Sequence, residues 1–169
     1  GISFSVKKGE IFGIGGLTGQ GKLGIANGIM GLYPAEGEVF FKGVKITLNE
    51  PKEVLKKGIA FVSEDRRGLG LLLDQSLNWN IAFTAMQIKE NFIKSYLGGL
   101  IKWRDDKAIT KIAREYIEKL QIKCVDEKQL ARELSGGNQQ KICLAKAFVL
   151  NPDLMFVSEP TRGIDVGAK

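Results

Sequence analysis

Short apolar runs separated by glycines occupy the first part of the chain. Ile2 to Val6 alternates apolar and polar residues, and Glu10 to Ile14 is a short apolar run, so both segments are predicted to be strands. Several glycines follow, and then an apolar-rich stretch from Lys22 to Met30 that predicts a helix. A strand, a glycine-rich turn and a helix in this order form the opening unit of an α/β fold.

Three further short elements are predicted before residue 63. Glu38 to Lys42 lies between Gly37 and Gly43, which is typical of a short strand. Pro51 to Lys57 begins with a proline that suits the first turn of a helix. Ile59 to Val62 is apolar and short, and predicts another strand.

Helical periodicity dominates the second half of the chain. Ser76 is a candidate N-cap for a helix from Asn78 to Met86. A second helix is predicted by six apolar residues spaced at i, i+3, i+4, i+7, i+8 and i+11, which form one continuous stripe. These residues are Ile109, Ile112, Ala113, Tyr116, Ile117 and Leu120. A third helix, Asn138 to Leu150, is apolar on nearly all sides, so we expect it to be buried.

The segments around these helices complete the predicted organisation. Ile88 to Trp103 mixes lysines with large apolar residues and is interrupted by Gly98 and Gly99. Leu154 to Val157 is a final apolar strand after Pro152. The chain is therefore predicted to have an α/β core that is interrupted by a helical lobe at roughly residues 67–150 and resumes at residue 151.

Composition excludes several chemistries. The chain has 169 residues, a net charge of +6 and no histidine. Without histidine it cannot build a Ser-His-Asp triad, an HExxH zinc site or a C2H2 zinc finger. Cys124 and Cys143 lack metal-ligand spacing, and two thiols in a chain of this length fit a reducing compartment. No run of 18 apolar residues is present, so we expect no membrane-spanning helix.

Glycine is over-represented at one place that can bind phosphate. Eight of the 21 glycines fall within the first 24 residues. The cofactor-binding candidates there spell G-x-x-G-x-G-K with the residue after it, and are Gly16, Leu17, Thr18, Gly19, Gln20, Gly21, Lys22 and Leu23. Glycines allow a turn whose backbone N–H groups close on phosphate oxygens, and the helix that follows adds its unpaired N–H groups and dipole. Lys22 would reach the β- and γ-phosphates.

Two alternatives for this turn come from the same residues. A glycine-rich tight turn without a ligand is one of them. Gly19, Gly21 and Gly24 also fit the dinucleotide fingerprint G-x-G-x-x-G, but that fingerprint needs an acidic residue about 20 positions later. Glu36 and Glu38 come too early for this role.

The residue after Lys22 departs from the usual phosphate-loop pattern. A serine or threonine normally stands there, and its hydroxyl coordinates Mg²⁺. Leu23 occupies that position and cannot ligate a metal. We therefore expect the loop to hold phosphate but to be handicapped in holding magnesium.

Four further segments carry a family resemblance that covers essentially the whole chain. Leu134 to Lys141 (LSGGNQQK) resembles the signature motif of the ATP-binding-cassette (ABC) superfamily. Phe61 to Arg66 resembles the segment around the Q-loop, Asp153 to Pro160 the Walker B strand, and Thr161 to Lys169 the D-loop. The last of these and the Ser-Glu-Asp-Arg sequence are similar to the second cassette of fused ribose/galactoside-type sugar importers.

The resemblance implies a fold and a shared active site. It implies a P-loop NTPase with a RecA-like core sheet, formed by residues 1–66 and 151–169, and an inserted helical signature subdomain at residues 67–150. ATP would lie between the phosphate loop of one cassette and the signature of another. The signature candidates that would bind the partner cassette's nucleotide are Ser135, Gly136, Gly137 and Asn138.

Two positions in the catalytic region depart from the family pattern. Walker B normally ends in Asp-Glu, and here the pair is Ser158-Glu159, so Mg²⁺ loses a second anchor. Glu159 remains the candidate base for the attacking water. Glu64 replaces the Q-loop glutamine and is the second catalytic candidate; it either contacts Mg²⁺ or water, or is a structural carboxylate facing Arg66 or Arg67.

The resemblance also implies a larger assembly. The adenine-stacking aromatic residue would precede residue 1 and the switch histidine would follow Lys169, so we expect the chain to be a piece of a longer protein. Expected partners are a second cassette, transmembrane permease subunits and, indirectly, a sugar-binding protein, at the cytoplasmic face of the membrane, with no nucleic acid. A nucleoside-importer cassette and a non-transport ABC regulatory or repair ATPase remain alternatives.

Overall fold

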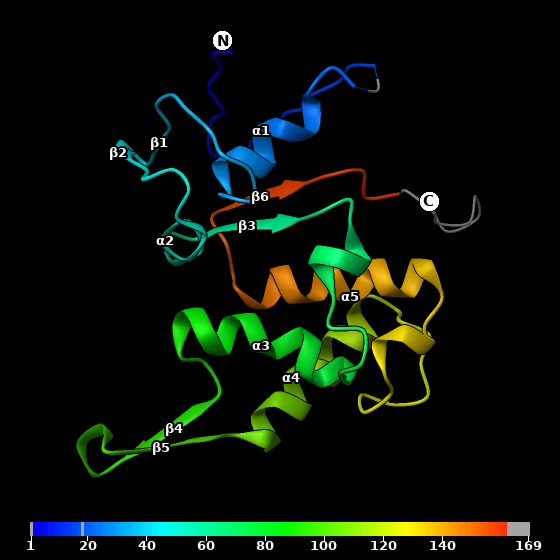
Figure 1. The fold of residues 1–169 in the computed structure, drawn as a ribbon. Helices are drawn as coiled ribbons and strands as arrows, with labels where there is room; N and C mark the ends of the chain where they lie inside the picture. The colour runs from blue at the N-terminus through cyan, green and yellow to red at the C-terminus, as the bar shows by residue number, and fades with distance from the viewer. Residues whose placement is uncertain (1, 18, 162–169) are drawn as a thin grey trace.

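The computed structural model describes residues 2–17 and 19–161 (Figure 1). The longer helices are α1 (Lys22–Ile29), α2 (Pro51–Lys56), α3 (Leu77–Lys89), α4 (Asp106–Lys119) and α5 (Gly136–Val149). The strands are β1 (Phe40–Phe41), β2 (Val44–Lys45), β3 (Ile59–Val62), β4 (Ile93–Tyr96), β5 (Ile101–Arg104) and β6 (Leu154–Val157). Three short helical turns are η1 (Arg66–Gly70), η2 (Leu97–Gly99) and η3 (Ala131–Glu133).

A parallel pair of strands lies at the centre of the α/β part. β3 and β6 pair in parallel from Ile59 opposite Leu154 to Val62 opposite Val157. Both strands had been predicted from their apolar runs, and both predictions are confirmed. Figure 1 shows α1 on one side of this pair and α5 on the other. Because β3 and β6 are parallel, both strands end at the same edge, between α1 and the helical layer.

Two strands predicted near the beginning of the chain are absent from the described residues. Ile2 to Val6 and Glu10 to Ile14 form no strand, and Ile11 is 99% exposed. A strand needs a neighbour that pairs with its backbone groups, and β3 pairs only with β6 within residues 2–17 and 19–161. The two segments instead meet through stacked rings of Phe4 and Phe12, with centroids 5.2 Å apart.

The predicted strand at Glu38 to Lys42 is shorter than expected. Only Phe40 and Phe41 are in β1, which pairs antiparallel with β2. Lys42 and Gly43 form the turn between them, and both have positive φ. The predicted strand end at Lys42 was wrong because a two-residue turn of this kind requires left-handed backbone there.

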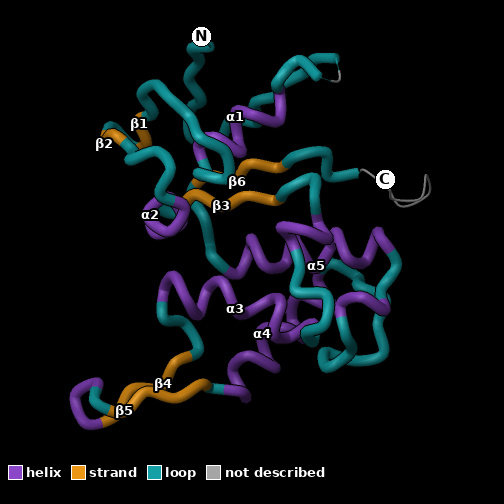
Figure 2. The backbone as a smooth tube through the Cα atoms, viewed as in Figure 1, coloured by secondary structure: helices purple, strands orange, loops and turns teal. Residues whose placement is uncertain are grey.

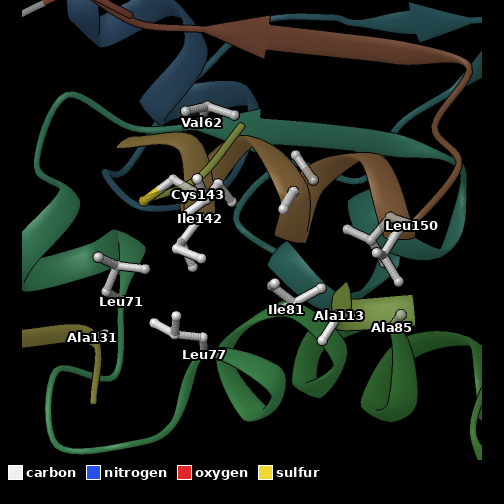
Figure 3. Close-up of a cluster of buried hydrophobic side chains, with 14 of the residues drawn as sticks. Val62, Leu71, Leu77, Ile81, Ala85, Ala113, Ala131, Ile142, Cys143 and Leu150 are labelled. Carbon is white, nitrogen blue, oxygen red and sulfur yellow. The ribbon is translucent and has the colours of Figure 1, made fainter. Parts of the chain in front are cut away.

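The largest hydrophobic core lies between the helices α3, α4 and α5 (Figure 3). The stripe predicted at residues 109–120 is confirmed, since Ile109 and Ala113 of α4 are buried and the other four members pack against the same core. α5 is buried as predicted and begins at Gly136, two residues earlier than expected. Core side chains that face one another in Figure 3 are Leu77, Ile81, Ala85, Ala113, Ile142, Cys143 and Leu150.

The helical layer is interrupted by an antiparallel hairpin, which the sequence did not predict. β4 and β5 pair from Ile93 opposite Arg104 to Tyr96 opposite Ile101, and Figure 2 shows this hairpin as strand between α3 and α4. Glu90 ends α3 in left-handed backbone with φ of 54°. Gly98, with φ of 66°, allows the tight turn between the strands. None of the helices in residues 2–17 and 19–161 has both the length and the apolar character needed to cross a bilayer.

Candidate nucleotide-binding site

The glycine cluster forms a turn that leads directly into α1. Gly19 and Gly21 have φ of 86° and 79°, in the left-handed region that costs other residues about 1–2 kcal/mol. A Cβ atom at either position would meet nothing within 4 Å, so backbone conformation and not space favours glycine there. Gly21 is the N-cap residue of α1, and no side chain caps that helix end. The positive end of the α1 dipole therefore faces the turn.

The turn is closed by its own residues. The Leu17 N–H donates to Oε1 of Gln20 at 3.1 Å, and the Gln20 N–H donates to the Leu17 carbonyl at 3.3 Å. Gly16 lies against this side chain, because a Cβ atom on it would come within 3.3 Å of the Gln20 oxygen. Thr18 lies outside the described residues. The bonds hold the loop in a shape that exposes its backbone at the surface.

Lys22 and Glu159 meet beside this turn. Nζ of Lys22 lies 3.4 Å from Oε1 of Glu159 in a partly exposed ion pair. Glu159 follows β6 and has left-handed backbone, with φ of 43°. The preceding residue, Ser158, donates its N–H to the Val62 carbonyl at 2.9 Å, which continues the β3–β6 pairing by one bond. The structure thus brings the phosphate-loop lysine and the candidate base to the carboxyl end of the parallel pair.

Glu64 follows β3 and lies at the same edge, where a side chain of α1 donates a hydrogen bond to it. Nδ2 of Asn27 donates to Oε1 of Glu64 at 3.4 Å and to the Leu23 carbonyl at 2.9 Å. The Ser63 hydroxyl lies 3.5 Å from the second oxygen of Glu64. Asn27 is only 1% exposed, and its Oδ1 has no hydrogen-bond partner within the described part of the chain. Sequence reasoning missed Asn27, although one buried amide in an apolar helix is a usable signal.

The donor set at this edge fits magnesium poorly. Mg²⁺ requires oxygen ligands in near-octahedral geometry and usually takes one or two carboxylates together with phosphates and waters. Leu23 offers no side-chain oxygen, Ser158 offers a neutral hydroxyl, and Glu159 is paired with Lys22. Among residues 2–17 and 19–161, no group of three or more acidic, histidine or cysteine side chains is placed to hold a metal ion. The side chains at this edge therefore do not form the usual ligand set for a magnesium ion.

The signature residues lie in a separate place. Ser135 is the exposed N-cap residue of α5, and its hydroxyl accepts a bond from Nδ2 of Asn138 at 3.0 Å. Oδ1 of Asn138 in turn accepts the Lys123 N–H at 2.9 Å, which fixes the first turn. Gly136 and Gly137 add no side chain at this helix end. Because α5 and α1 lie on opposite sides of the β3–β6 pair (Figure 1), the signature does not meet the chain's own phosphate loop.

A groove separates the α/β part from the helical layer next to Glu64. Its volume is about 310 Å³, and its lining includes Leu69 and Gly70 of η1 with Thr84 and Gln87 of α3. The floor is rigid. Lys146 of α5 donates to the Gly70 carbonyl at 3.0 Å, and a Cβ atom on Gly70 would lie only 2.8 Å from Sγ of Cys143. Burial raises the pKa of the Cys143 thiol to about 11.

Comparison with known proteins identifies the family. The sequence profile described as ABC transporter matches residues 1–162. The chain belongs to the ABC transporter family. It is 41% identical to the ribose import ATP-binding protein of Clostridium tetani over 169 residues, which are 99% of this cassette and 32% of that protein. It is 39% identical to a putative ribose/galactose/methyl galactoside import ATP-binding protein of Halalkalibacterium halodurans, of which it covers 31%. The cassette thus spans about a third of the length of these relatives.

Solved structures agree on the fold. The ATP-binding cassette MJ0796, in a dimeric post-hydrolysis state bound to ADP and Pi, superposes with a TM-score of 0.75 at 24% identity, and the match covers 98% of this chain and 67% of that one. A second dimeric structure of the same cassette gives a TM-score of 0.67, over 90% and 61% of the two chains. The predicted α/β ABC cassette fold is therefore confirmed. The D-loop residues 162–169 lie outside the described residues.

Proposed function

We propose that this chain is a nucleotide-binding cassette of a simple-sugar importer, in which ATP binding and hydrolysis drive transport. The observation that carries the proposal is the meeting of Lys22 and Glu159, 3.4 Å apart, beside a left-handed glycine turn at the start of α1. The sugar class follows from the relatives, which are named as ribose or galactoside import ATP-binding proteins.

The turn suits the phosphates of ATP. Its N–H groups and the uncapped start of α1 present partial positive charge, and Lys22 adds a full charge beside them. The β- and γ-phosphates would take the place of Glu159 as the partner of Lys22. Glu159 would then be released to face the attacking water, while Glu64 stays held by Asn27.

We propose that this site binds nucleotide but hydrolyses it poorly. Phosphoryl transfer depends mainly on positioning and charge neutralisation, and Mg²⁺ normally supplies much of the neutralising charge. Leu23 and Ser158 remove both usual protein anchors for that ion. Glu64 is the remaining carboxylate near Leu23, and it compensates in part.

The signature would serve a second cassette, carried in the same full-length polypeptide as in the fused importers that this sequence resembles. Ser135, Gly136 and Gly137 start a helix of 14 residues whose first N–H groups have no side-chain cap. Such a helix end binds anions, so it can contact the γ-phosphate held by the partner cassette. Residues 67–150 would act as the signature subdomain, with residues 1–66 and 151–169 as the RecA-like core.

Permease subunits in the membrane would be the transport partners of this cassette, with a sugar-binding protein acting indirectly. The groove between η1 and α3 is lined by Ser63, the residue before Glu64, so a permease segment seated there would lie close to the nucleotide site. In this arrangement the cassette would lie at the cytoplasmic face of the membrane.

The asymmetry is tested in the full transporter. Ser135→Arg puts a bulky charge at the start of α5 and should abolish most ATPase activity. Lys22→Ala changes the weaker site and should lower ATPase activity less than Ser135→Arg does. Ser3→Arg, an exposed position, is the matched control for the added charge. A greater loss from Lys22→Ala than from Ser135→Arg would contradict the proposed division of roles.

Binding is tested with this chain alone. A fluorescent ATP analogue should bind with nearly the same affinity with and without Mg²⁺, and no phosphate should be released. Full Mg²⁺-dependent turnover by the isolated chain would overturn the proposal that its own site is degenerate.

A further inference from the structure

The β4–β5 hairpin leaves large apolar side chains uncovered at its far end. Figure 1 shows the hairpin extending away from the helices, with its turn at the distal end. Leu97 is 72% exposed and Leu100 is 87% exposed, and Tyr96, Ile101 and Trp103 are each about half exposed. No described residue outside the hairpin covers this tip, so folding alone does not explain its apolar character.

The side chains change in a fixed order along the hairpin. The turn carries Leu97 and Leu100, and the next pair is Tyr96 opposite Ile101. The following two pairs bring in the charges, as Ser95 opposite Lys102 and Lys94 opposite Trp103. Leu97 and Leu100 are therefore outermost, Tyr96 and Ile101 come next, and Lys102, Lys94 and Trp103 lie nearer the base.

The charged side chains of the hairpin are all positive, and acidic residues occur only at its base. Between Glu90 and Asp105 no acidic residue occurs, whereas Lys94, Lys102 and Arg104 are all basic. The carboxylates of Asp105 and Glu90 pair with Lys94 and Lys102 at 2.9 and 3.0 Å and hold the lysines near the base. Nearly half of each lysine side chain stays exposed, so the ammonium groups can still meet an anion.

Tyr96 and Trp103 form a rigid pair on one face of the hairpin. Their rings stack with centroids 4.5 Å apart. Because residues of one face alternate with those of the other, Tyr96, Ile101 and Trp103 share this face with Lys94. Tyrosine and tryptophan with flanking lysine are the residues that favour the boundary between water and lipid headgroups.

We propose that the β4–β5 tip enters the headgroup region of a membrane that contains anionic lipid. Leu97 and Leu100 would lie deepest, Tyr96 and Ile101 next, and Trp103 at the level of the headgroup phosphates with Lys94 and Lys102. The change from apolar to charged side chains along the hairpin favours a lipid interface. A protein partner would need a cavity shaped to receive the narrow, protruding turn. The contact is independent of nucleotide binding and goes beyond the proposed transport function.

Vesicle binding by the purified chain tests this contact. The chain should sediment with phosphatidylcholine vesicles that contain phosphatidylglycerol, less with phosphatidylcholine alone, and less again in high salt. Leu97→Ser/Leu100→Ser should lower the partition by about tenfold or more. Val44→Ser/Val125→Ser removes two exposed apolar side chains elsewhere and should change nothing. Thermal unfolding of each variant checks that it is folded.

Tryptophan emission reports the depth of the tip. Trp79 and Trp103 are the two tryptophans of the chain, so Trp79→Phe leaves Trp103 as the reporter. Its emission should shift to the blue on anionic vesicles and be quenched by lipids brominated near the headgroup. Lys22→Ala should bind vesicles normally, which separates this contact from the nucleotide site.

Three results would overturn the proposal. The chain could remain in solution with anionic vesicles, or the double serine variant could bind as tightly as the parent. In the assembled transporter, a photoreactive residue at position 97 should label lipid. Labelling of a permease polypeptide in its place would assign the tip to a protein partner.

Discussion

The ammonium of Lys22 and the carboxylate of Glu159 lie 3.4 Å apart and neutralise one another at the mouth of the glycine turn. Under the proposed function, an incoming triphosphate would replace this carboxylate as the partner of Lys22. A partly exposed pair of this kind is worth about 0–1 kcal/mol, so the competition is modest. Binding of a triphosphate by Lys22 would nevertheless leave the Glu159 carboxylate without this partner.

Glu159→Gln should therefore strengthen nucleotide binding. The change removes the competing ion pair and a negative charge near the phosphates, and we expect affinity for a fluorescent ATP analogue to rise up to about fivefold. Glu53→Gln, an exposed carboxylate on α2, is the control and should have no effect. Weaker binding by Glu159→Gln would show that the carboxylate helps to hold the nucleotide.

Lys22→Ala should reduce affinity for the same analogue by about tenfold or more, because a charge-assisted contact to phosphate is lost. Lys22→Arg keeps the charge and should retain part of the affinity. Lys52→Ala, on exposed α2, should bind as the parent does. Equal affinities for the parent and Lys22→Ala would exclude this turn as the phosphate site.

Asn27→Leu should disturb Glu64 without changing the turn directly. The leucine has a similar volume but cannot donate to Oε1 of Glu64 or to the Leu23 carbonyl. Any residual effect of Mg²⁺ on nucleotide affinity should fall as much as in Glu64→Gln, and the double variant should be no worse than either single one. Independent, additive losses would mean that Asn27 acts through folding and not through Glu64.

Cys143 should be unreactive in the folded chain. Because burial raises the pKa of its thiol to about 11, almost no thiolate exists at pH 8. An aromatic disulfide reagent should react with it at that pH only after unfolding in urea. The unfolded thiol ionises at a lower pH than the folded one, so this residue contributes to a loss of stability as pH rises above about 9. Rapid labelling of Cys143 at pH 8 under native conditions would contradict the packing.

Glu127 should matter more for stability than an exposed carboxylate with the same kind of partner. Glu127 is buried, and its two oxygens accept from Nε and Nη2 of Arg114 at 3.0 Å each. Glu127→Gln should cost about 1 kcal/mol in urea unfolding, whereas Glu115→Gln, which loses an exposed i,i+4 pair with Lys119, should cost clearly less.

This pair also has a defined pH dependence. The Arg114 guanidinium lowers the pKa of Glu127. Glu127 therefore contributes stability above the pKa of an unfolded glutamate, and that contribution is lost as pH falls through the lower folded value. The difference between the parent and Glu127→Gln should shrink below about pH 4.

Much of the site could be predicted because its signals are local. The glycine spacing, the following helix and Lys22 stand within a few residues of one another, and the structure places them together. Glu159 was assigned to the same site through the Walker B resemblance, and the parallel pairing of β3 and β6, which end at one edge, explains why it lies there. Asn27 was missed because its partner Glu64 lies 37 residues later, and a helical pattern alone does not show which side chain it meets.

The strand predictions failed where pairing depends on distant residues. Ile2 to Val6 has the alternation of a strand, but alternation does not supply a neighbour, and the described residues contain none beside it. The hairpin at Ile93 to Arg104 was missed for the opposite reason. Its strands have four residues each and mix lysines with apolar side chains, so the cross-strand register that stabilises them is not visible in either strand alone.

The packing of Gly70 against Cys143 has a mechanical consequence. η1 begins two residues after Glu64, and it is fastened to α5 by close contact and by the bond from Lys146. α5 is also the helix whose first residue follows Ser135. A movement of Glu64 that also moves η1 must either break these contacts or move α5 as well. The contact between η1 and α5 therefore links the position of Glu64 to the helix end that follows Ser135, so that a movement at one of these places would be transmitted to the other.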